Sequence, residues 1–171
     1  MELSQNNPIS TSLKNQFESC MVMLQKLIDI MLPDMWQSDN NGIPVWQQVY
    51  HVVYFIDNWF RYTYVRKQKD HFVGDFSLSP DLDKPLPESE VISQSDMNDY
   101  LKKIHCKTVA VFNNMTDEKL GKPIIDGGSK EYTHMDVTVG QIRHIMYNIG
   151  SLNRLLRDKG LPESDWYAYN E

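Results

Sequence analysis

Apolar residues recur at steps of three and four positions in four separate stretches, and this spacing limits what the chain can fold into. Such steps place apolar side chains on one face of an α-helix, because a helix has about 3.6 residues per turn. In the first stretch, for example, Phe17, Leu24 and Ile28 share a face. We therefore predict an all-α fold with long helices at about residues 11–31, 44–67, 93–114 and 136–159.

Prolines and small polar residues mark the ends of the first two predicted helices. Ser10, Thr11 or Ser12 can cap the first helix, and Pro33 closes it. Pro44 suits the first position of the second helix, because proline lacks the N–H that this position leaves unpaired. We expect this second helix to continue to about Lys67.

Similar signals mark the last two predicted helices. The third helix begins near Ser93 or Ser95. The fourth begins between Asp136 and Thr138 and ends just before Gly160, since glycine tolerates the left-handed conformation that follows many helices.

The segment from residue 70 to residue 94 lacks helical periodicity and forms a long connection. Three prolines exclude a helix there, namely Pro80, Pro85 and Pro87. Three apolar residues are expected to anchor the segment over the helices, namely Phe72, Phe76 and Leu78. A connection of this length allows the second and third helices to run parallel or to lie on opposite sides. The predicted architecture is a four-helix bundle with one long connection between its second and third helices.

The remaining segments carry turn signals and aromatic residues. Residues 116–118 are typical of the cap of a short helical turn, and Asp126-Gly127 could close a small hairpin. The C-terminal tail contains Trp166, Tyr167 and Tyr169, which we expect to dock on the same bundle or on a partner subunit.

Composition and charge exclude several classes of protein. The 171 residues fit one domain, and we treat residues 1–171 as a single helical domain. A net charge of -6 argues against a nucleic-acid partner, because binding to phosphates needs clustered lysine and arginine. We find no signal peptide and no membrane-spanning stretch, so no membrane partner is expected. Cys20 and Cys106 lack metal-type spacing and are interpreted as reduced, partly buried thiols in a cytoplasm.

Two of the five histidines lie on apolar-rich helices, and both are candidates for a functional site. His51 lies within the apolar run 49–53, so its imidazole needs a polar partner or a cavity. His144 borders the apolar face of the fourth helix. The residue one turn later is Asn148, at the spacing by which two side chains of a helix can bind one ion.

Residues 141–153 resemble the last-helix motif of the DinB/YfiT-like family of bacterial proteins. That motif usually reads His-x-x-x-His followed by a small residue, and this chain has His144 and Asn148 at the two histidine positions. A further family histidine comes from the second helix, and His51 occupies the matching place. The turn at residues 117–120 is also similar, so the resemblance extends over most of the chain.

The resemblance implies a DinB-like four-helix bundle that binds a divalent metal, zinc or nickel, through His51, His144 and position 148. Several members of the family look like thiol transferases or hydrolase-like enzymes, so the implied partner is a small-molecule thiol or another small ligand. The family resemblance and the aromatic tail also favour a homodimer.

Asn148 departs from the family pattern, because an amide oxygen binds zinc or nickel more weakly than an imidazole does. A carboxylate could complete the set, and Asp57 and Asp136 are the candidates. However, Asp57 should point elsewhere on its helix, and Asp136 is better used as a cap. Two hypotheses follow: a divalent-metal-dependent transferase or hydrolase with a degenerate site, or a metal-free relative that binds a small ligand or dimerises.

Other polar residues have alternative interpretations. Tyr54 and Tyr147 could supply hydroxyl groups to a pocket, or they could be aromatic residues at the edge of the bundle. His134 is predicted to be an exposed histidine in the loop before the fourth helix, although it could fold over the bundle mouth. His105 lies among charged residues and is expected to face water.

Overall fold

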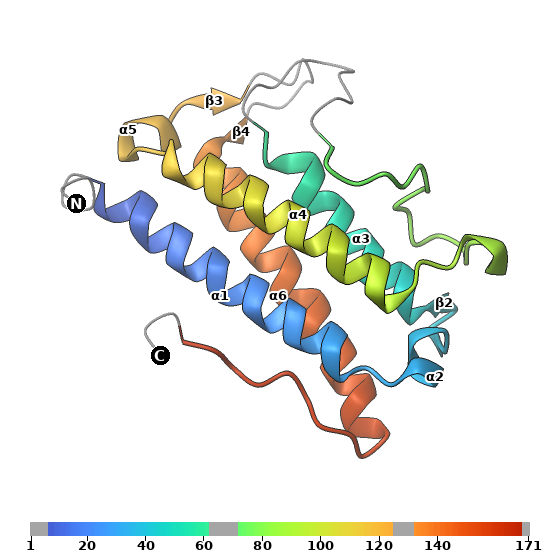
Figure 1. The fold of residues 1–171 in the computed structure, drawn as a ribbon. Coiled ribbons are helices and arrows are strands. Elements are labelled where there is room, and N and C mark those ends of the chain that lie inside the picture. The colour runs from blue at the N-terminus through green and yellow to red at the C-terminus, as the bar shows by residue number, and fades with distance from the viewer. Residues whose placement is uncertain (1–6, 62–71, 125–131, 169–171) are drawn as a thin grey trace.

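The structure is a computed structural model that describes residues 7–61, 72–124 and 132–168. It is mostly helical, so the predicted all-α class is confirmed. The described residues contain long helices where the periodicity predicts them (Figure 1), namely α1 (Pro8–Ile30), α3 (Val45–Trp59), α4 (Gln94–Asn113) and α6 (His134–Asp158).

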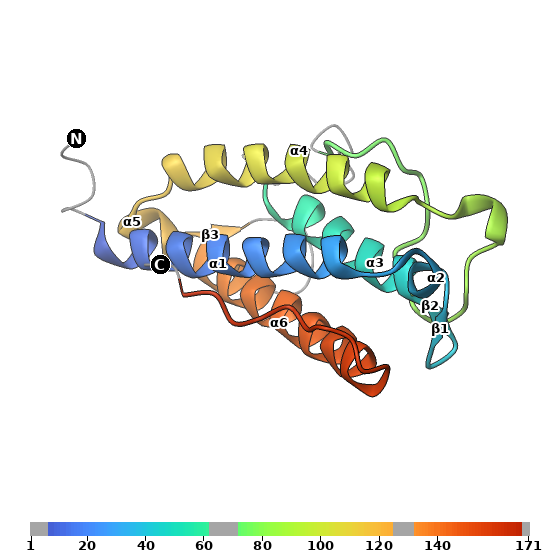
Figure 2. The ribbon, with the colours of Figure 1, turned by 60° about the horizontal axis from the view of Figure 1, so that its bottom comes forward.

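The long helices surround one apolar core. α1 packs against α6 and α4, and α3 packs against the same two helices, so the contacts close into a ring. α1 and α6 run in one direction, whereas α3 and α4 run in the opposite direction (Figure 1). The core includes fully buried Phe17, Trp46, Tyr50 and Ile145. The long connection therefore returns the chain to the end of the bundle where α3 begins, and α4 also begins there (Figure 2). The second and third long helices thus run parallel, which is one of the two arrangements that the sequence allowed.

Short elements join the long helices. The turn between α1 and α3 contains α2 (Pro33–Trp36), β1 (Asp39–Asn40) and β2 (Ile43–Pro44), and β1 pairs antiparallel with β2. Between α4 and α6 lie α5 (Asp117–Leu120) and the antiparallel strands β3 (Pro123–Ile124) and β4 (Tyr132–Thr133). The short turn predicted at residues 116–118 is thereby confirmed, with Thr116 as its cap. The predicted Asp126-Gly127 hairpin turn lies outside the described residues.

α1 begins at Pro8, before the predicted start at Thr11, and the capping prediction is wrong. The Ser10 hydroxyl donates backwards to the Asn7 carbonyl and does not cap the helix. The cap comes from a distant element, because the Asp117 carboxylate accepts hydrogen bonds from the backbone N–H groups of Ile9 at 3.2 Å and Ser10 at 2.8 Å. Desolvation raises the pKa of Asp117, but the hydrogen bonds from these N–H groups outweigh it and hold the pKa below its usual value, as expected at the positive end of a helix dipole.

α3 ends at Trp59, so the prediction that it continues through residues 60 and 61 is wrong. Phe60 has an extended backbone and is 2% exposed. The centroid of its ring lies 4.7 Å from that of Phe17 and 5.5 Å from that of Phe112. The buried aromatic ring thus belongs to the residue that follows the last residue of the helix. The rest of the predicted helix, residues 62–67, lies outside the described residues.

The N-terminal ends of α4 and α6 carry side-chain caps. Ser93 caps α4 by accepting a hydrogen bond from the backbone N–H of Asp96, which decides between the two predicted serines. Thr133 and Asp136 form a capping box at α6, so the interpretation of Asp136 as a capping residue is confirmed. α6 therefore begins at His134, earlier than predicted. At the other end of α6, Gly160 adopts φ 68°, as predicted.

The connection before α4 is irregular over residues 72–87 and then forms the 3₁₀ turn η1 (Glu88–Glu90), as its prolines predict. A fully buried side chain, Gln47 of α3, binds this segment at three backbone groups. Its amide nitrogen donates to the carbonyls of Asp81 and Lys84, and its oxygen accepts from the N–H of Leu86. Phe76 and Leu78 pack on the core, as predicted, and Phe72 contacts the ring of Tyr54.

The C-terminal segment returns along α1 (Figure 1). Ser164, 3% exposed, donates to the carbonyl of Met23, and Asn153 of α6 binds both backbone groups of Ser164. Tyr167 packs partly on the core, whereas Trp166 is 72% exposed, so the predicted docking on the same bundle fails for Trp166. Tyr169 lies outside the described residues. Within the described residues, none of the helices combines the length and the apolar character needed to cross a membrane.

Candidate functional site

His51 of α3 and His144 of α6 face each other where these two helices pack. Their Nε2 atoms lie 3.0 Å apart, which is hydrogen-bond distance, and the ring planes meet at 75°. Both side chains are half-buried. The structure therefore brings together the two histidines that the sequence selected, although they are 93 residues apart in the chain.

A backbone carbonyl fixes the proton positions of this pair. Nδ1 of His51 lies 2.7 Å from the carbonyl oxygen of Pro80, which can only accept a hydrogen bond. Nδ1 of His51 therefore carries a proton. With both rings neutral, Nε2 of His51 is the acceptor, and Nε2 of His144 donates to it. Nδ1 of His144 is then left with an unprotonated lone pair.

The surroundings of the pair are aromatic. The ring of Phe55 lies 4.9 Å from His51 and 5.8 Å from His144, in both cases edge to face. Burial, followed by the proximity of His51, lowers the pKa of His144 to about 4. His144 is therefore neutral at pH 7, and no residue in the described part of the chain donates a hydrogen bond to its Nδ1.

Asn148 lies one turn after His144, but its amide group is bound to its own helix. Nδ2 of Asn148 donates to the carbonyl oxygen of His144 at 2.9 Å. In the described part of the chain this amide makes no hydrogen bond to a ring nitrogen of His51 or of His144. The third predicted site residue is thus near the pair in sequence, without a hydrogen bond to either ring.

The residues present match only part of a metal site. Two imidazoles bound to one tetrahedral zinc ion, each about 2.0–2.1 Å from it, hold their nitrogens about 3.3 Å apart, close to the spacing of this pair. Metal-binding histidines also donate their other N–H to a backbone carbonyl, as His51 does to Pro80. However, the described residues contain no group of three or more His, Cys, Asp and Glu side chains that could hold an ion. The donor set therefore does not fit a three-ligand zinc or nickel centre.

The two carboxylates considered as a third ligand are engaged elsewhere. Asp136 closes the capping box of α6 with Thr133. Asp57, fully buried, lies at the centre of a polar cluster that sequence analysis missed. Its helical offset of six residues from His51 turns it towards α4, as its position on the helix predicts.

Five hydrogen bonds satisfy Asp57. Lys107 of α4, which is 7% exposed at its side chain, donates to its carboxylate and to its backbone carbonyl. Its Oδ2 accepts from the Tyr100 hydroxyl at 2.9 Å and from the backbone N–H groups of Val73 at 2.9 Å and Gly74 at 3.2 Å. Burial lowers the pKa of Lys107, although the adjacent carboxylate counteracts this shift. We interpret this Asp57 cluster as an anchor that joins α3, α4 and the connection.

The other candidate residues lie away from the histidine pair or lack the required chemistry. Tyr147 is 79% exposed, so it is a surface residue, whereas Tyr54 packs among the rings of neighbouring aromatic residues. His134 is half-buried in the first turn of α6, so its prediction as an exposed loop residue is wrong. Burial lowers its pKa.

The two thiols and His105 differ in burial, and burial decides the protonation of Cys20. Burial raises the pKa of the Cys20 thiol to about 11, which leaves it protonated and unreactive at neutral pH. Cys106 is exposed, so the prediction that it is partly buried is wrong. His105 is exposed, as predicted, and its Nε2 lies 2.6 Å from a carboxylate oxygen of Glu18.

Comparison with known proteins adds no relative: no protein-family model, no curated protein and no solved structure matches this chain. The function must therefore be argued from the chemistry of the described residues.

Proposed function

We propose that this chain is a DinB/YfiT-like protein that binds a small molecule at the His51–His144 pair without a three-ligand metal centre. The ligand class is a small thiol or another molecule that offers a hydrogen-bond donor to Nδ1 of His144. Four long helices in this order, with histidines facing each other from the second and the last, support the family assignment. The predicted homodimer stays a prediction.

One observation carries the proposal, namely the hydrogen bond between the two Nε2 atoms at 3.0 Å. Together with the Pro80 carbonyl, this bond selects the tautomer of His144 in which Nδ1 is an acceptor. The low pKa, about 4, keeps that acceptor neutral at physiological pH.

The same low pKa supports binding over catalysis by proton abstraction. A general base works best when its pKa is near the working pH. His144, with a pKa of about 4, has a proton affinity far below that of a thiolate, whose conjugate thiol has a pKa of about 8.5. His144 would accept a hydrogen bond from a thiol and leave the proton on sulfur.

A second candidate is a divalent-metal-dependent transferase or hydrolase with a degenerate site. Two features favour it, namely the spacing of the two Nε2 atoms and the carbonyl of Pro80 behind His51. In that case His51 and His144 would hold zinc or nickel, and the ion would supply the polarisation that activates a thiol or water. Asn148 would have to release the His144 carbonyl to contribute its amide oxygen.

Calorimetric titration of zinc and nickel into the chelator-treated protein separates the two candidates. We expect no stoichiometric binding to the native chain, and one site per chain in Asn148→His, which restores a third imidazole. His51→Ala in the Asn148→His background should remove that site. A single tight site in the native chain, lost in His51→Ala, would instead establish the metal-dependent candidate.

Ligand binding is tested on the same protein by ¹⁵N NMR of the histidine rings. Titration with 2-mercaptoethanol should shift the Nδ1 resonance of His144 and leave that of His51, which is bound to Pro80, nearly unchanged. The control is 1,2-dimethoxyethane, an ether of similar chain length that offers no hydrogen-bond donor. Equal shifts with both compounds, or no shift with either, would contradict binding of a donor at Nδ1.

A further inference from the structure

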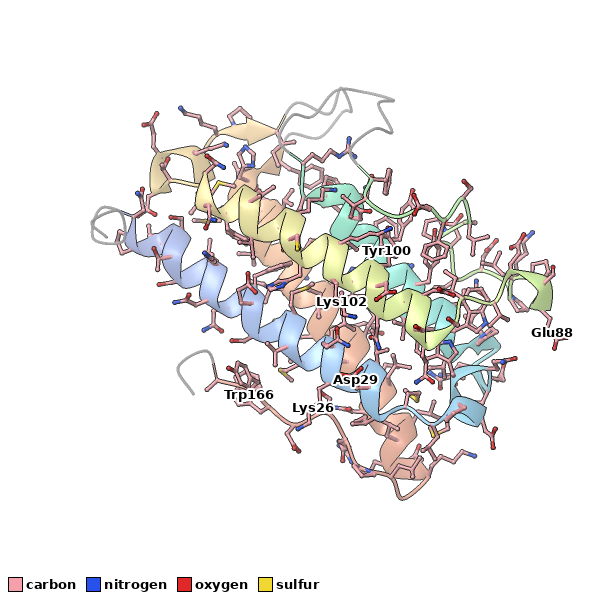
Figure 3. The ribbon with its side chains drawn as sticks, viewed as in Figure 1. Lys26, Asp29, Glu88, Tyr100, Lys102 and Trp166 are labelled. Atoms are coloured by element: carbon pink, nitrogen blue, oxygen red, sulfur yellow. The ribbon has the colours of Figure 1, made fainter. Side chains whose placement is uncertain are left out.

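A cleft between α1 and α4 lies on the side of the core opposite the α3–α6 contact that holds the histidine pair. Its volume is about 430 Å³, within the range of about 300–1,000 Å³ typical of small-molecule sites. Figure 3 looks onto this face and labels Lys26 and Asp29 of α1 and Lys102 of α4. The cleft is large enough for a molecule of modest size.

The floor of the cleft is apolar. Met21 and Leu101 belong to the core and contribute its inner wall, while Val22 is 43% exposed beside them. An exposed valine next to core residues in a concave surface is a place where an apolar body can be removed from water. The middle of the cleft therefore suits a hydrocarbon or an aromatic ring.

A carboxylate with one unused oxygen forms one end of the cleft. Oε2 of Glu18 lies 2.6 Å from Nε2 of His105, whereas Oε1 is buried and has no hydrogen-bond partner in the described part of the chain. Most buried polar atoms have such a partner, so each exception needs an explanation. The Glu18 side chain as a whole is 26% exposed, so a donor in the cleft that reaches its carboxylate, with a rotation of the carboxylate that brings Oε1 to the donor, provides one.

The charges around the cleft favour a cation. Its two lysines are paired with aspartates that are not part of its lining: Lys26 with Asp165 at 3.0 Å and Lys102 with Asp99 at 3.0 Å. Counted together with these partners, the described charged groups at the cleft are four carboxylates, two lysines and His105, and the carboxylates are Glu18, Asp29, Asp99 and Asp165. The lining therefore attracts positive charge more than negative charge.

We propose that the α1–α4 cleft binds an organic amine, with its apolar body on Met21, Val22 and Leu101 and its ammonium group at the Glu18 carboxylate. Charge-assisted hydrogen bonds from ammonium to carboxylate are among the stronger ones in proteins. The site uses none of the residues of the histidine pair, so its test is independent of the function proposed above.

The probes are three molecules with one body and different end groups, namely 4-phenylbutylamine, 4-phenylbutanol and 4-phenylbutyrate. Each is titrated into the full chain and followed by calorimetry and by backbone amide NMR. We expect the amine to bind one site per chain, to shift the amides of residues 18–29 and 101–105, and to bind about tenfold more tightly than the alcohol. The butyrate should bind more weakly still.

Two variants test the named contacts. Glu18→Gln should lower the affinity for the amine to that for the alcohol, whereas Glu88→Gln, the same charge change at a remote exposed turn (Figure 3), should leave it unchanged. Val22→Trp, which fills the cleft at an exposed position, should abolish binding of all three molecules. Tight binding of the butyrate, an unchanged amine affinity in Glu18→Gln, no binding by the native chain, or amide shifts confined to other elements would each overturn the proposal.

Discussion

Asp57 and His51 of α3 are only six residues apart, but they differ in burial and in the number of hydrogen bonds that they make. Asp57 is completely buried, and five hydrogen bonds from α4 and from the long connection satisfy it. His51 is half-buried and has two polar contacts, one of them to another titratable ring. Burial of a charge demands full pairing, whereas a neutral imidazole tolerates a spare lone pair.

The difference separates a structural cluster from a candidate binding site. In the Asp57 cluster each described acceptor of the carboxylate is used, so a ligand could enter only by breaking hydrogen bonds. In the histidine pair no described residue donates a hydrogen bond to Nδ1 of His144, so this atom can accept one without such a loss. We therefore expect mutations in the Asp57 cluster to change stability, and mutations in the histidine pair to change binding.

The largest effect is expected from Asp57→Ala. This change leaves the Lys107 ammonium buried without its counterion, and breaking a buried pair in this way costs about 3–5 kcal/mol of unfolding free energy. Urea denaturation measures the loss. The double variant Asp57→Leu with Lys107→Met, which removes both charges, should lose less, although the Tyr100 hydroxyl and the N–H groups of Val73 and Gly74 still lose their acceptor. A loss below about 1 kcal/mol in Asp57→Ala would show that the cluster is not an anchor.

A smaller effect is expected from Gly74→Ala, at the point where the connection meets the cluster. A Cβ at this position would lie 2.3 Å from the ring of Tyr100, so the ring or the backbone must move. Overpacking of this kind costs about 1–3 kcal/mol. Thermal denaturation checks the loss, and Tyr100→Leu should reduce the penalty of Gly74→Ala. Equal penalties in both backgrounds would contradict the contact.

The pH dependence of stability isolates the histidine pair. The folded-state pKa of His144, about 4, lies below its ordinary value of 6.5, so below pH 6.5 the unfolded chain binds a proton that the folded chain excludes. The stabilising contribution is complete above pH 6.5 and is lost as the pH falls to about 4. We expect a difference on the order of 1–2 kcal/mol, after allowance for solvent screening.

The control for this pH effect is His144→Phe, which cannot be protonated. His134, whose pKa is also lowered, contributes in the same direction to both proteins and cancels in the difference. The carboxylates with a lowered pKa, such as Asp117 and Glu163, lose their stabilising contribution as the pH falls through the acidic end of this window, and this loss also cancels because both proteins contain them. Parallel stability curves for the native chain and His144→Phe between pH 4 and 6.5 would show that His144 is not held neutral.

The smallest effect is expected for the stability of His144→Phe at pH 8. The hydrogen bond to His51 is between neutral groups, and its loss is offset by burial of a larger apolar ring, so the change should stay within about 1 kcal/mol. Urea denaturation measures it beside Asp57→Ala. A loss of unfolding free energy as large as that of Asp57→Ala would show that the histidine pair stabilises the fold as much as the Asp57 cluster does.

The helices were predictable because their signals are local. Ser93 and Gly160 act within one turn of the helix ends that they mark, and Asp136 was recognised as a capping residue although its partner Thr133 was not. The start of α1 was not predictable in this way, because its cap is Asp117, which lies 107 residues beyond Ser10 in the sequence. A local pattern contains no information about a partner that only the folded chain brings close.

The histidine pair also has one part that the sequence predicts and one part that only the folded chain shows. Apolar neighbours and family resemblance single out His51 and His144, and the structure places them 3.0 Å apart. The acceptor that fixes their tautomers is the backbone carbonyl of Pro80, and every residue carries such a group. The Asp57 cluster was missed for a related reason, since its lysine lies 50 residues away, on a helix that reads as amphipathic.

The packing of α1 against α6 has a consequence for the time course of synthesis. Part of the apolar face of α1 packs against α6, a helix that begins only at His134. At translation rates of about 5–20 residues per second, more than a hundred residues of chain take roughly 5–20 seconds to follow α1 out of the ribosome. The nascent chain must therefore keep this face from aggregating for seconds, a period in which chaperones would have access to it.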